Sequence, residues 1–523
     1  MKNKKYFFKA NIYIFALIFA VLNILLFYKP LFAYIVANVN FASLDGKVIL
    51  MEILLVELFL SYVFMVIIAA IPYITKPVVA LIFISNSVAL YFEIQYNTIL
   101  DVTMMGNVFN TNPQETANLL SYKLIIYVLL LGVLPSYLMC KIKIVRIFSW
   151  KKMLALILIP LVLLLGILYL NSRTWLWLDK NLKVLGALSM PFSYSINAMR
   201  YKIPLMLKDK KEYQLPNAIF KDGEKTVVVL VIGESARAGN FSLYGYNRNT
   251  NPNLEKIKNL VVFPNTTSCA TYTTAGVGCM LSAGVGGKNY ERLPTYLKRH
   301  DVKTFWRSTN WGEPHIDVDS FAKAGDIKQS CTTEACKNND YDDILLYNLN
   351  SLIKDNIQHN NVFIVLHTST SHGPTYYKKY PSSFEKFAPV CKSTEIKENC
   401  TPDDLVNAYD NTILYTDHIL SQLISQLRGL NIPAVMIYMS DHGESLGENN
   451  TYLHGMPNLI APDVQRKIPF LVWMSPQFIQ QHNIDPKKLA KDSSYSQDNI
   501  FHTIMGAFGM QSEFYQPKLD VLK

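Results

Sequence analysis

The sequence predicts an α-helical transmembrane domain followed by an α/β sandwich with a mostly parallel central sheet. Half of the 523 residues are hydrophobic and only 17% are charged, which is too apolar for an ordinary soluble enzyme. The 50 Lys+Arg and 40 Asp+Glu are nevertheless too many for a chain that lies in the membrane throughout. All ten histidines lie at or beyond His300, and six of the seven cysteines lie at or beyond Cys269. The chemistry therefore belongs to the second half of the chain.

Five segments are long and apolar enough to cross a hydrocarbon core, which requires roughly 20 helical residues. They cover residues 11–28, 53–74, 78–96, 124–140 and 153–170. The first segment follows a lysine-rich N-terminus and could be a cleaved signal. Because no clear cleavage site follows it and four more spans do, we expect an uncleaved anchor.

Positive charge predicts the orientation of these spans. Basic residues gather at the N-terminus (Lys2, Lys4, Lys5 and Lys9) and between the fourth and fifth spans (Lys141, Lys143, Arg146, Lys151 and Lys152). The positive-inside rule places both regions in the cytoplasm. An odd number of spans then places everything after residue 170 on the far side of the membrane. The remaining Lys and Arg form no basic stripe or nucleic-acid motif, so the net charge of +10 does not predict a nucleic-acid partner.

The cysteines form three pairs that are local in the sequence. These pairs are Cys269/Cys279, Cys331/Cys336 and Cys391/Cys400, whereas Cys140 stays alone at a membrane end. The far side of the membrane is oxidising, which favours disulfides over unpaired thiols. We therefore predict three short-loop disulfides and one free thiol.

Residues 171–216 combine aromatic side chains with scattered Lys and Arg, a composition typical of helices at the headgroup layer. The predicted domains are therefore a five-span transmembrane domain (1–170), interfacial bridging helices (171–216) and a far-side catalytic domain (217–523). The loop 101–121, between the third and fourth spans, is polar. Solvation at the membrane surface is sufficient to explain this composition.

Four short apolar runs in the second half predict buried strands. They are TVVVLVI (226–232), NVFIVL (361–366), AVMIYM (434–439) and PFLVWM (469–474). Their apolar residues do not alternate with polar ones, as expected of strands that are buried on both faces of a parallel sheet. The stretches between them can supply crossover helices, which completes an α/β sandwich.

Reactive residues follow three of these four runs, at the sheet edge where ligands collect in such folds. The first run leads into Glu234, the second into His367 and His372, and the third into Asp441 and His442. Carboxylate oxygens and imidazole nitrogens are suitable ligands for zinc. The strand ends together predict a metal site.

A threonine-rich segment, SCATYTTAGVGCM, covers residues 268–280 and encloses Thr271, Thr273 and Thr274 between two cysteines. It could be a stapled loop without chemistry. Alternatively, one hydroxyl is a nucleophile at the start of a helix, where metal contact lowers its pKa and the helix amides favour a phosphate.

Together these motifs resemble the phosphoethanolamine transferases of Gram-negative inner membranes. The similar segments are GESARAGNFSLYGYNRNT, SCATYTTAGVGCM, HTSTSHGPTYYKKYP and MSDHGESLGENNTYLHGMPNLIAP, together with the five spans. That family includes lipid A-modifying enzymes of the colistin-resistance type and belongs to the alkaline phosphatase/sulfatase superfamily. The resemblance implies a multi-pass protein of the bacterial inner membrane, with a cytoplasmic N-terminus and a periplasmic catalytic domain.

The resemblance also implies roles for single residues. Four would bind zinc: Glu234, Thr273, Asp441 and His442. Thr273 would also be the nucleophile. His372 and His454 would contact the substrate phosphate or a second zinc, and one of them could act as general acid. Asn107 and Glu115 would lie near the ethanolamine headgroup. The segment AGVGCM departs from the family's SVPCM, which leaves the acceptor open.

The implied reaction transfers phosphoethanolamine from phosphatidylethanolamine, through a covalent intermediate on Thr273, to lipid A or another envelope acceptor. Such decoration gives resistance to cationic peptides such as polymyxins. One alternative is a phosphoglycerol transferase of the lipoteichoic acid synthase type, which the cysteine pairs and the segments HGPTYYKKYP and YLHGMP disfavour. Another alternative is a catalytically inert membrane scaffold. The presence of all four implied zinc ligands disfavours it.

Overall fold

The chain forms two compact units. The computed structural model describes residues 6–111, 113–146, 150–171, 175–207, 211–221, 223–284, 288–458, 460–491 and 493–523. One unit consists of Met1–Phe109 and Leu120–Met206, and the other of Asn110–Leu119 and Leu207–Lys523. This division groups residues 171–206 with the apolar helices, whereas the predicted boundaries were residues 170 and 216.

In the described part of the first unit, the regular structure is helical apart from one short strand pair. Its helices are α1 (Ile12–Phe27), α2 (Lys29–Asn38), α3 (Leu44–Ala70), α4 (Thr75–Tyr96), α5 (Val102–Asn110), α7 (Tyr122–Tyr127), the π-helix η1 (Val128–Val133), α8 (Leu134–Cys140), α9 (Trp150–Leu170), α10 (Trp175–Leu188) and α11 (Phe192–Leu207). By length and composition, α3, α4, α9 and the continuous helix Tyr122–Cys140 can each cross a membrane. The bent pair α1 and α2 supplies a fifth span if both helices belong to one crossing.

Two of these helical segments differ from the predicted spans. The first continues beyond residue 28, because after a bend of 63° the chain starts α2, with Pro30 in its first turn. The second begins at Leu44 and not at residue 53, because the Ser43 side chain accepts a hydrogen bond from the backbone of Gly46 and caps the helix. Charged residues near its start concealed this helix end in the sequence.

A buried polar network joins the turn between α10 and α11 to the apolar helices. Asn23 and Tyr28, on or next to α1, both donate to the carbonyl of Met190, at 2.9 and 2.7 Å. Ser189 donates to Glu57 of α3 at 2.6 Å. Polar groups within a bilayer need such partners, so this network fixes the turn among the helices.

The second unit is built on a seven-stranded sheet. In spatial order the strands are β5 (Leu260–Val262), β13 (Phe470–Met474), β10 (Ala434–Ser440), β4 (Val227–Gly233), β9 (Val362–His367), β7 (Lys303–Ser308) and β8 (Ser320–Lys323). All strands are parallel except β13, which runs antiparallel to both neighbours. The four predicted strands and the mostly parallel sheet are confirmed. Because β13 is reversed, its carboxyl end lies at the opposite edge, which explains why no reactive residue follows it.

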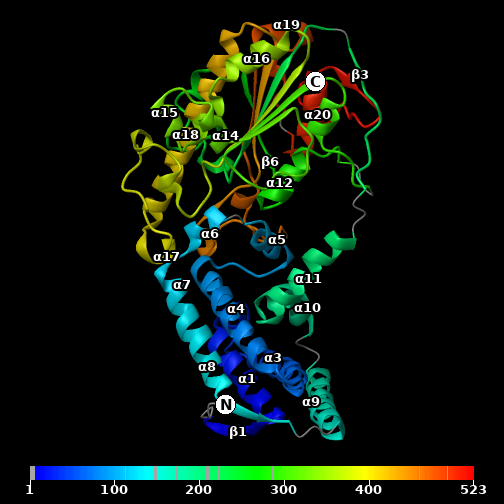
Figure 1. Ribbon diagram of the computed structural model, residues 1–523, viewed down its shortest axis with the longest axis vertical. Coiled ribbons are helices and arrows are strands. Elements are labelled where there is room, and N and C mark those ends of the chain that lie inside the picture. Colours follow the sequence, from blue (N-terminus) through cyan, green and yellow to red (C-terminus); the bar gives the residue numbers. More distant parts are fainter. Residues whose placement is uncertain are drawn as a thin grey trace. The chain divides into compact units, whose positions relative to one another are not determined.

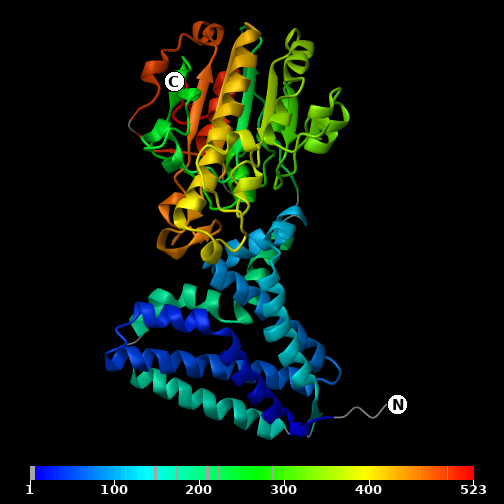
Figure 2. The same ribbon diagram turned by 90° about the vertical axis from the view of Figure 1, so that its left-hand side faces the viewer.

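Helices cover both faces of the sheet (Figure 1). Alternate residues of β4 point to opposite faces: Val227, Val229 and Val231 into one apolar cluster, and Val228, Leu230 and Ile232 into the other. The first cluster includes α14 (Ala324–Gln329), α16 (Leu349–Ile357) and α18 (Pro402–Gly429). The second includes α12 (Thr273–Met280), α13 (Leu293–Lys298), α19 (Pro476–His482) and α20 (Asp498–Ala507). Figure 2 shows the 28-residue α18 running along its face of the sheet.

Short elements complete the chain. They are the helices α6 (Pro113–Leu119), α15 (Glu334–Lys337) and α17 (Ile396–Asn399), and the paired strands β1 (Phe8–Asn11) with β2 (Ile142–Val145), β3 (Ile219–Phe220) with β15 (Met510–Gln511), β6 (Thr266–Thr267) with β14 (Tyr495–Ser496), and β11 (Ser445–Leu446) with β12 (Tyr452–Leu453). The pairs β6/β14 and β11/β12 flank segments that carry predicted site residues.

The structure contains the three predicted disulfides, Cys269–Cys279, Cys331–Cys336 and Cys391–Cys400, and Cys140 has no disulfide partner. All three bridges lie in the second unit. They are therefore consistent with an oxidising location for that unit.

We expect peptide mapping of the unreduced, purified protein to recover these three bridges, because each joins cysteines that are close in the sequence and lie in the unit expected on the oxidising side of the membrane. In denaturant without reductant, iodoacetamide should modify Cys140 and none of the other six cysteines. A reduced sample, in which all seven should react, is the control. Modification of any of the six before reduction would contradict the pairing.

Candidate active site

The pairing of β4 with β10 brings two acidic residues together. Gly233 at the end of β4 lies opposite Ser440 at the end of β10, so Glu234 and Asp441 follow at the same edge. The Ser235 backbone N–H donates to Asp441 Oδ1 at 3.0 Å and holds the two loops together. Ser235 adopts a φ of +52°, which is uncommon for a residue with a side chain and typical of constrained functional turns.

The first turn of α12 presents one of the three candidate threonines to this edge. Thr273 is the first residue of the helix, and its Oγ1 lies 3.3 Å from Glu234 Oε2 and 3.4 Å from His442 Nε2. Thr271 is fully buried, and its hydroxyl instead donates to the carbonyl of Met456 at 2.6 Å. Among the described contacts of these threonines, only the Thr273 hydroxyl lies within hydrogen-bonding distance of Glu234 and His442.

Four side chains converge at one point. His442 Nε2 lies 3.3 Å from Asp441 Oδ2 and 3.5 Å from Glu234 Oε1, in addition to its approach to Thr273. Glu234, Asp441 and His442 are almost completely buried and offer ligand atoms that all lie within 4.8 Å of one another. The predicted ligand set is thus assembled from two strand ends and one helix start.

The chemistry of this set fits a divalent cation. Asp441 Oδ2 is buried and has no hydrogen-bond partner, which is costly for a carboxylate oxygen. Burial raises the pKa of Asp441 well above its ordinary value, and the negative charge of Glu234 raises this pKa further. A bound cation would offset both penalties.

His442 is prepared to act as a neutral ligand. Its Nδ1 lies 2.8 Å from the carbonyl of Gly443, and a carbonyl can only accept, so Nδ1 carries a proton. The pKa of His442 is lowered to about 3, first because the ring is buried and then because of the nearby His454, against the opposing effect of Glu234. The ring is therefore neutral near pH 7, and the Nε2 lone pair faces the two carboxylates.

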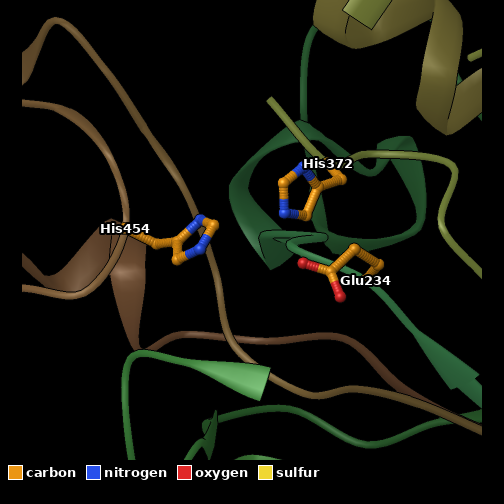
Figure 3. A group of neighbouring side chains, drawn as sticks. All are labelled: Glu234, His372 and His454. Carbon is orange, nitrogen blue, oxygen red and sulfur yellow. The ribbon is translucent and has the colours of Figure 1, made fainter. Parts of the chain in front are cut away.

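A second group of side chains borders the first. Glu234, His372 and His454 point toward one another and also offer ligand atoms within 4.8 Å (Figure 3). The rings of His442 and His454 lie 4.3 Å apart, and His454 Nδ1 lies 3.3 Å from Glu444 Oε2. His372 and His454 are therefore placed to contact a phosphate or a second cation that binds near Glu234.

The sequence analysis missed Asn310, which follows β7. Its amide Nδ2 donates to Glu234 Oε2 at 2.6 Å and to the carbonyl of Thr368 at 2.8 Å. The strand before it, KTFWRS, alternates between half-buried and buried residues and does not form a continuous apolar run. Its two apolar residues, Phe305 and Trp306, are adjacent, so the letters show no polar and apolar alternation either, and no sequence signal marked this fifth strand end.

Three other residues that the sequence analysis singled out are not among the side chains that converge at this site. His367 is buried at the end of β9, with its Nδ1 3.5 Å from Glu313 Oε1. Asn107 lies on α5 in the first unit, and the Glu115 side chain lies outside the described part of the chain. Their roles near the headgroup stay predictions.

Comparison with known proteins identifies the family. Residues 226–510 match the sulfatase family, and residues 58–203 match the family described as phosphoethanolamine transferase EptA/EptB. The first match covers more than half of the chain and contains the four converging side chains.

Two relatives and one solved structure agree with these matches. The chain is 42% identical to phosphoethanolamine transferase EptA of Helicobacter pylori, over 84% of this chain and 83% of the relative. It is 35% identical to phosphatidylethanolamine transferase Mcr-1 of Escherichia coli, over 84% and 85%. Its fold matches the integral membrane lipooligosaccharide phosphoethanolamine transferase A from Neisseria meningitidis with a TM-score of 0.90 at 29% identity, over 98% and 99% of the chains. The chain therefore belongs to the EptA family of phosphoethanolamine transferases, within the alkaline phosphatase/sulfatase superfamily.

Proposed function

We propose that this protein transfers phosphoethanolamine from phosphatidylethanolamine to lipid A through a covalent intermediate on Thr273. The main observation that supports this proposal is the position of Thr273 Oγ1 at the start of α12, within 3.4 Å of both Glu234 and His442. Family membership supports the reaction type. The donor is supported by the name of the Escherichia coli relative. The acceptor is supported by a relative named Kdo(2)-lipid A phosphoethanolamine 7''-transferase from Salmonella typhimurium.

We infer that Glu234, Thr273, Asp441 and His442 hold one zinc ion. Two carboxylates, one neutral imidazole and one hydroxyl form a closed four-ligand set that suits zinc. A zinc ion bound there would act as a Lewis acid and lower the pKa of the threonine hydroxyl. His372 and His454, with Glu234, could hold a second ion, although they serve equally well as contacts for the substrate phosphate.

In the first step, Thr273 loses its hydroxyl proton to water and Oγ1 attacks the phosphorus of the donor. A bond forms between this oxygen and phosphorus while the bond from phosphorus to the diacylglycerol oxygen breaks. Diacylglycerol leaves after its oxygen takes a proton from His372 or His454. The backbone amides at the start of α12 favour the negative phosphate during this step.

In the second step, a phosphate or hydroxyl oxygen of lipid A attacks the same phosphorus. The bond between phosphorus and Thr273 Oγ1 then breaks, Oγ1 takes a proton from water, and phosphoethanolamine stays on lipid A. The histidine that gave its proton in the first step takes one from the attacking hydroxyl or, for a phosphate acceptor, from water. The added ammonium groups reduce the net negative charge of the acceptor and weaken its attraction for cationic peptides.

The helical half serves this reaction by confinement. Donor and acceptor are both lipids, so anchoring the catalytic unit at the outer face of the inner membrane raises their effective concentration. This requires a cytoplasmic N-terminus and a periplasmic second unit, as the distribution of Lys and Arg predicts. Asn107 and Glu115 would contact the ethanolamine ammonium there.

We expect expression of the gene in a polymyxin-sensitive Gram-negative host to add phosphoethanolamine to lipid A and to raise the polymyxin concentration needed to stop growth. Mass spectrometry of isolated lipid A measures the first effect. Cells that express Thr273→Ala at the same level are the control. Unmodified lipid A would contradict the proposed acceptor. Lipid A that carries phosphoglycerol would contradict the proposed donor.

We expect Thr273→Val to form no covalent adduct, because valine keeps the branched shape but lacks the attacking oxygen. Wild-type protein incubated with phosphatidylethanolamine should carry phosphoethanolamine on the peptide that spans Cys269–Cys279. Thr274→Val, the same exchange on the next residue, should retain the adduct. Detection of the adduct on Thr271 or Thr274, or full transfer by Thr273→Val, would assign the nucleophile elsewhere.

We expect Asp441→Asn and His442→Ala to retain far less zinc than the wild type after dialysis against a weak chelator, with an affinity lower by more than about 100-fold. Elemental analysis measures the zinc that remains. Asp417→Asn is a matched control, because Asp417 is equally buried but accepts hydrogen bonds from the backbone of Asn253 and Leu254. Equal zinc contents in all four proteins would overturn the ligand assignment.

A further inference from the structure

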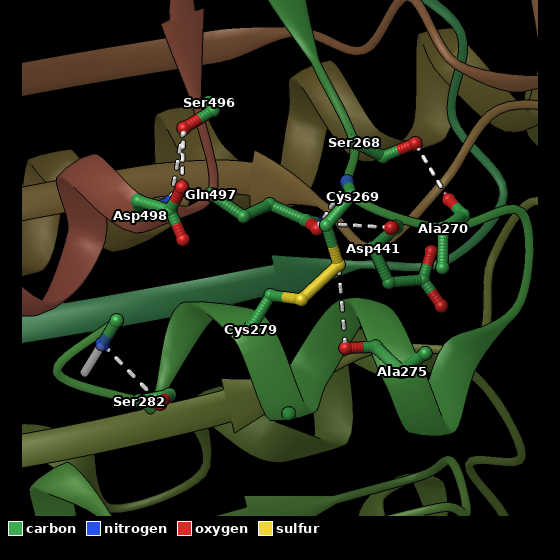
Figure 4. Close-up of a disulfide and its surroundings, with 12 residues drawn as sticks. Ser268, Cys269, Ala270, Ala275, Cys279, Ser282, Asp441, Ser496, Gln497 and Asp498 are labelled. Atoms are coloured by element: carbon green, nitrogen blue, oxygen red, sulfur yellow. Dashed lines mark hydrogen bonds between the residues drawn. A yellow bond between two sulfur atoms is a disulfide. The ribbon is translucent and has the colours of Figure 1, made fainter. Parts of the chain in front are cut away.

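Gln497 is fully buried next to the active site, and both ends of its amide have partners (Figure 4). Its Nε2 donates to the backbone carbonyls of Asp441 at 2.6 Å and Ser440 at 3.2 Å. Its Oε1 accepts from the backbone N–H of Cys269 at 3.0 Å. The residue directly precedes α20, so an element outside the site reaches two of its loops at once.

These two loops carry different parts of the proposed chemistry. Asp441 belongs to the loop after β10, which carries two of the proposed metal ligands, Asp441 and His442. Cys269 lies four residues before Thr273, in the loop that leads into α12. The amide of Gln497 therefore connects the backbone that carries the nucleophile with the backbone that carries the metal ligands.

Helix α12 contacts the same carbonyl from another side. A Cβ atom on Gly276 would lie 2.3 Å from Asp441 O, so the helix backbone packs directly against this carbonyl. The carbonyl of Asp441 is thus fixed between α12 and Gln497. A shift of either neighbour would change the separation of Thr273 Oγ1 from the ligand atoms.

The disulfide at Cys269 does not supply this connection. It joins Cys269 to Cys279, which lies near the end of α12, so both of its ends belong to the nucleophile segment (Figure 4). Other hydrogen bonds of the loop lead to the segment after β12: Ser268 N–H donates to the Arg466 carbonyl at 2.8 Å, and Asn458 Nδ2 donates to the Cys269 carbonyl at 2.6 Å. Gln497 reaches the backbone of Ser440 and Asp441 instead.

We propose that Gln497 is a positioning residue that sets the distance between Thr273 and the metal ligands. The inference rests on the proposed roles of Thr273 and Asp441. The position requires an amide, because one end must accept from an N–H while the other donates to two carbonyls. A glutamate there keeps the acceptor but turns a second oxygen toward those carbonyls, and a methionine fills the space without either hydrogen bond. Catalytic groups tolerate displacements of only about 0.5 Å, so either change should lower the rate of attack.

Asn499, in the first turn of α20 and two residues after Gln497, provides a matched control. Its Nδ2 donates to the carbonyl of Leu519 at 2.8 Å and its Oδ1 accepts from Ser496 N–H at 2.8 Å. Asn499→Asp therefore makes the same exchange of amide for carboxylate, but the hydrogen bond that it removes leads to Leu519 and not to the ligand loop. A purely structural role for Gln497 predicts that both exchanges have similar effects.

The experiment compares full-length wild type, Gln497→Glu, Gln497→Met and Asn499→Asp in detergent. The first measurement is hydrogen exchange of the Cys269 amide in metal-free protein. Gln497→Met, which lacks the acceptor for this amide, should accelerate the exchange at least 10-fold. The second is zinc retention against a chelator. The third is the rate of adduct formation at several phosphatidylethanolamine concentrations. We expect both Gln497 variants to lose about 10- to 100-fold in zinc affinity and in maximal adduct rate, with KM unchanged within about twofold.

Asn499→Asp should keep all three values within about twofold of wild type, even if its thermal midpoint falls. Gln497→Met retains a similar side-chain volume, so it tests the proposal even if the buried carboxylate of Gln497→Glu prevents folding. Wild-type zinc affinity and adduct rate in a folded Gln497 variant would overturn the proposal, as would equal losses in Asn499→Asp. If the wild type itself formed no adduct, the proposed function would fail, whereas hydrogen exchange and zinc retention would still test the role of Gln497.

Discussion

The parallel pairing of β4 with β10 is the constraint on which the active site depends. With Gly233 opposite Ser440, the next residue of each strand is an acidic side chain, and the two carboxylates must share one edge of the sheet. A Cβ atom on Gly233 would lie 2.6 Å from the hydroxyl oxygen of Tyr438, so this strand end approaches its neighbour more closely than a larger residue allows. A shift of one residue would send one of the two acids to the opposite face.

This register creates an electrostatic problem that the rest of the site addresses. Glu234 and Asp441 are buried beside each other, and burial of two like charges is unfavourable without a counter-charge. The neutral His442 ring supplies a lone pair and no positive charge. The amides of Asn310 and Ser235 donate to the two carboxylates, but Asp441 Oδ2 remains without a hydrogen-bond partner. The site is thus incomplete as a set of side chains and suited to a cation.

The membrane half follows a different physical rule. Its helices have apolar side chains on their exposed surfaces, and a set of buried polar groups, Asn23, Tyr28 and Glu57, is hydrogen-bonded inside the bundle. The turn at Ser189–Met190 uses these groups, so the segment after α9 is held by specific bonds as well as by its apolar surface. The proposed substrates are lipids, so this anchoring keeps the enzyme close to them. The enzyme then does not need to bind a dissolved substrate from solution.

The sequence by itself determined the features that depend on local hydrophobicity and spacing: the apolar helices, the strands β4, β9, β10 and β13, the cysteine pairs and the acidic and histidine residues at strand ends. Uninterrupted apolar runs and short separations carry this information without reference to distant residues. Tertiary structure decided which threonine hydroxyl reaches Glu234 and His442, and it showed the contact of Asn310 with Glu234. It also revealed Gln497, whose partner Cys269 is 228 residues away in the sequence. Such contacts depend on which loops from separate strands lie together at one edge of the sheet. A local sequence pattern does not predict this.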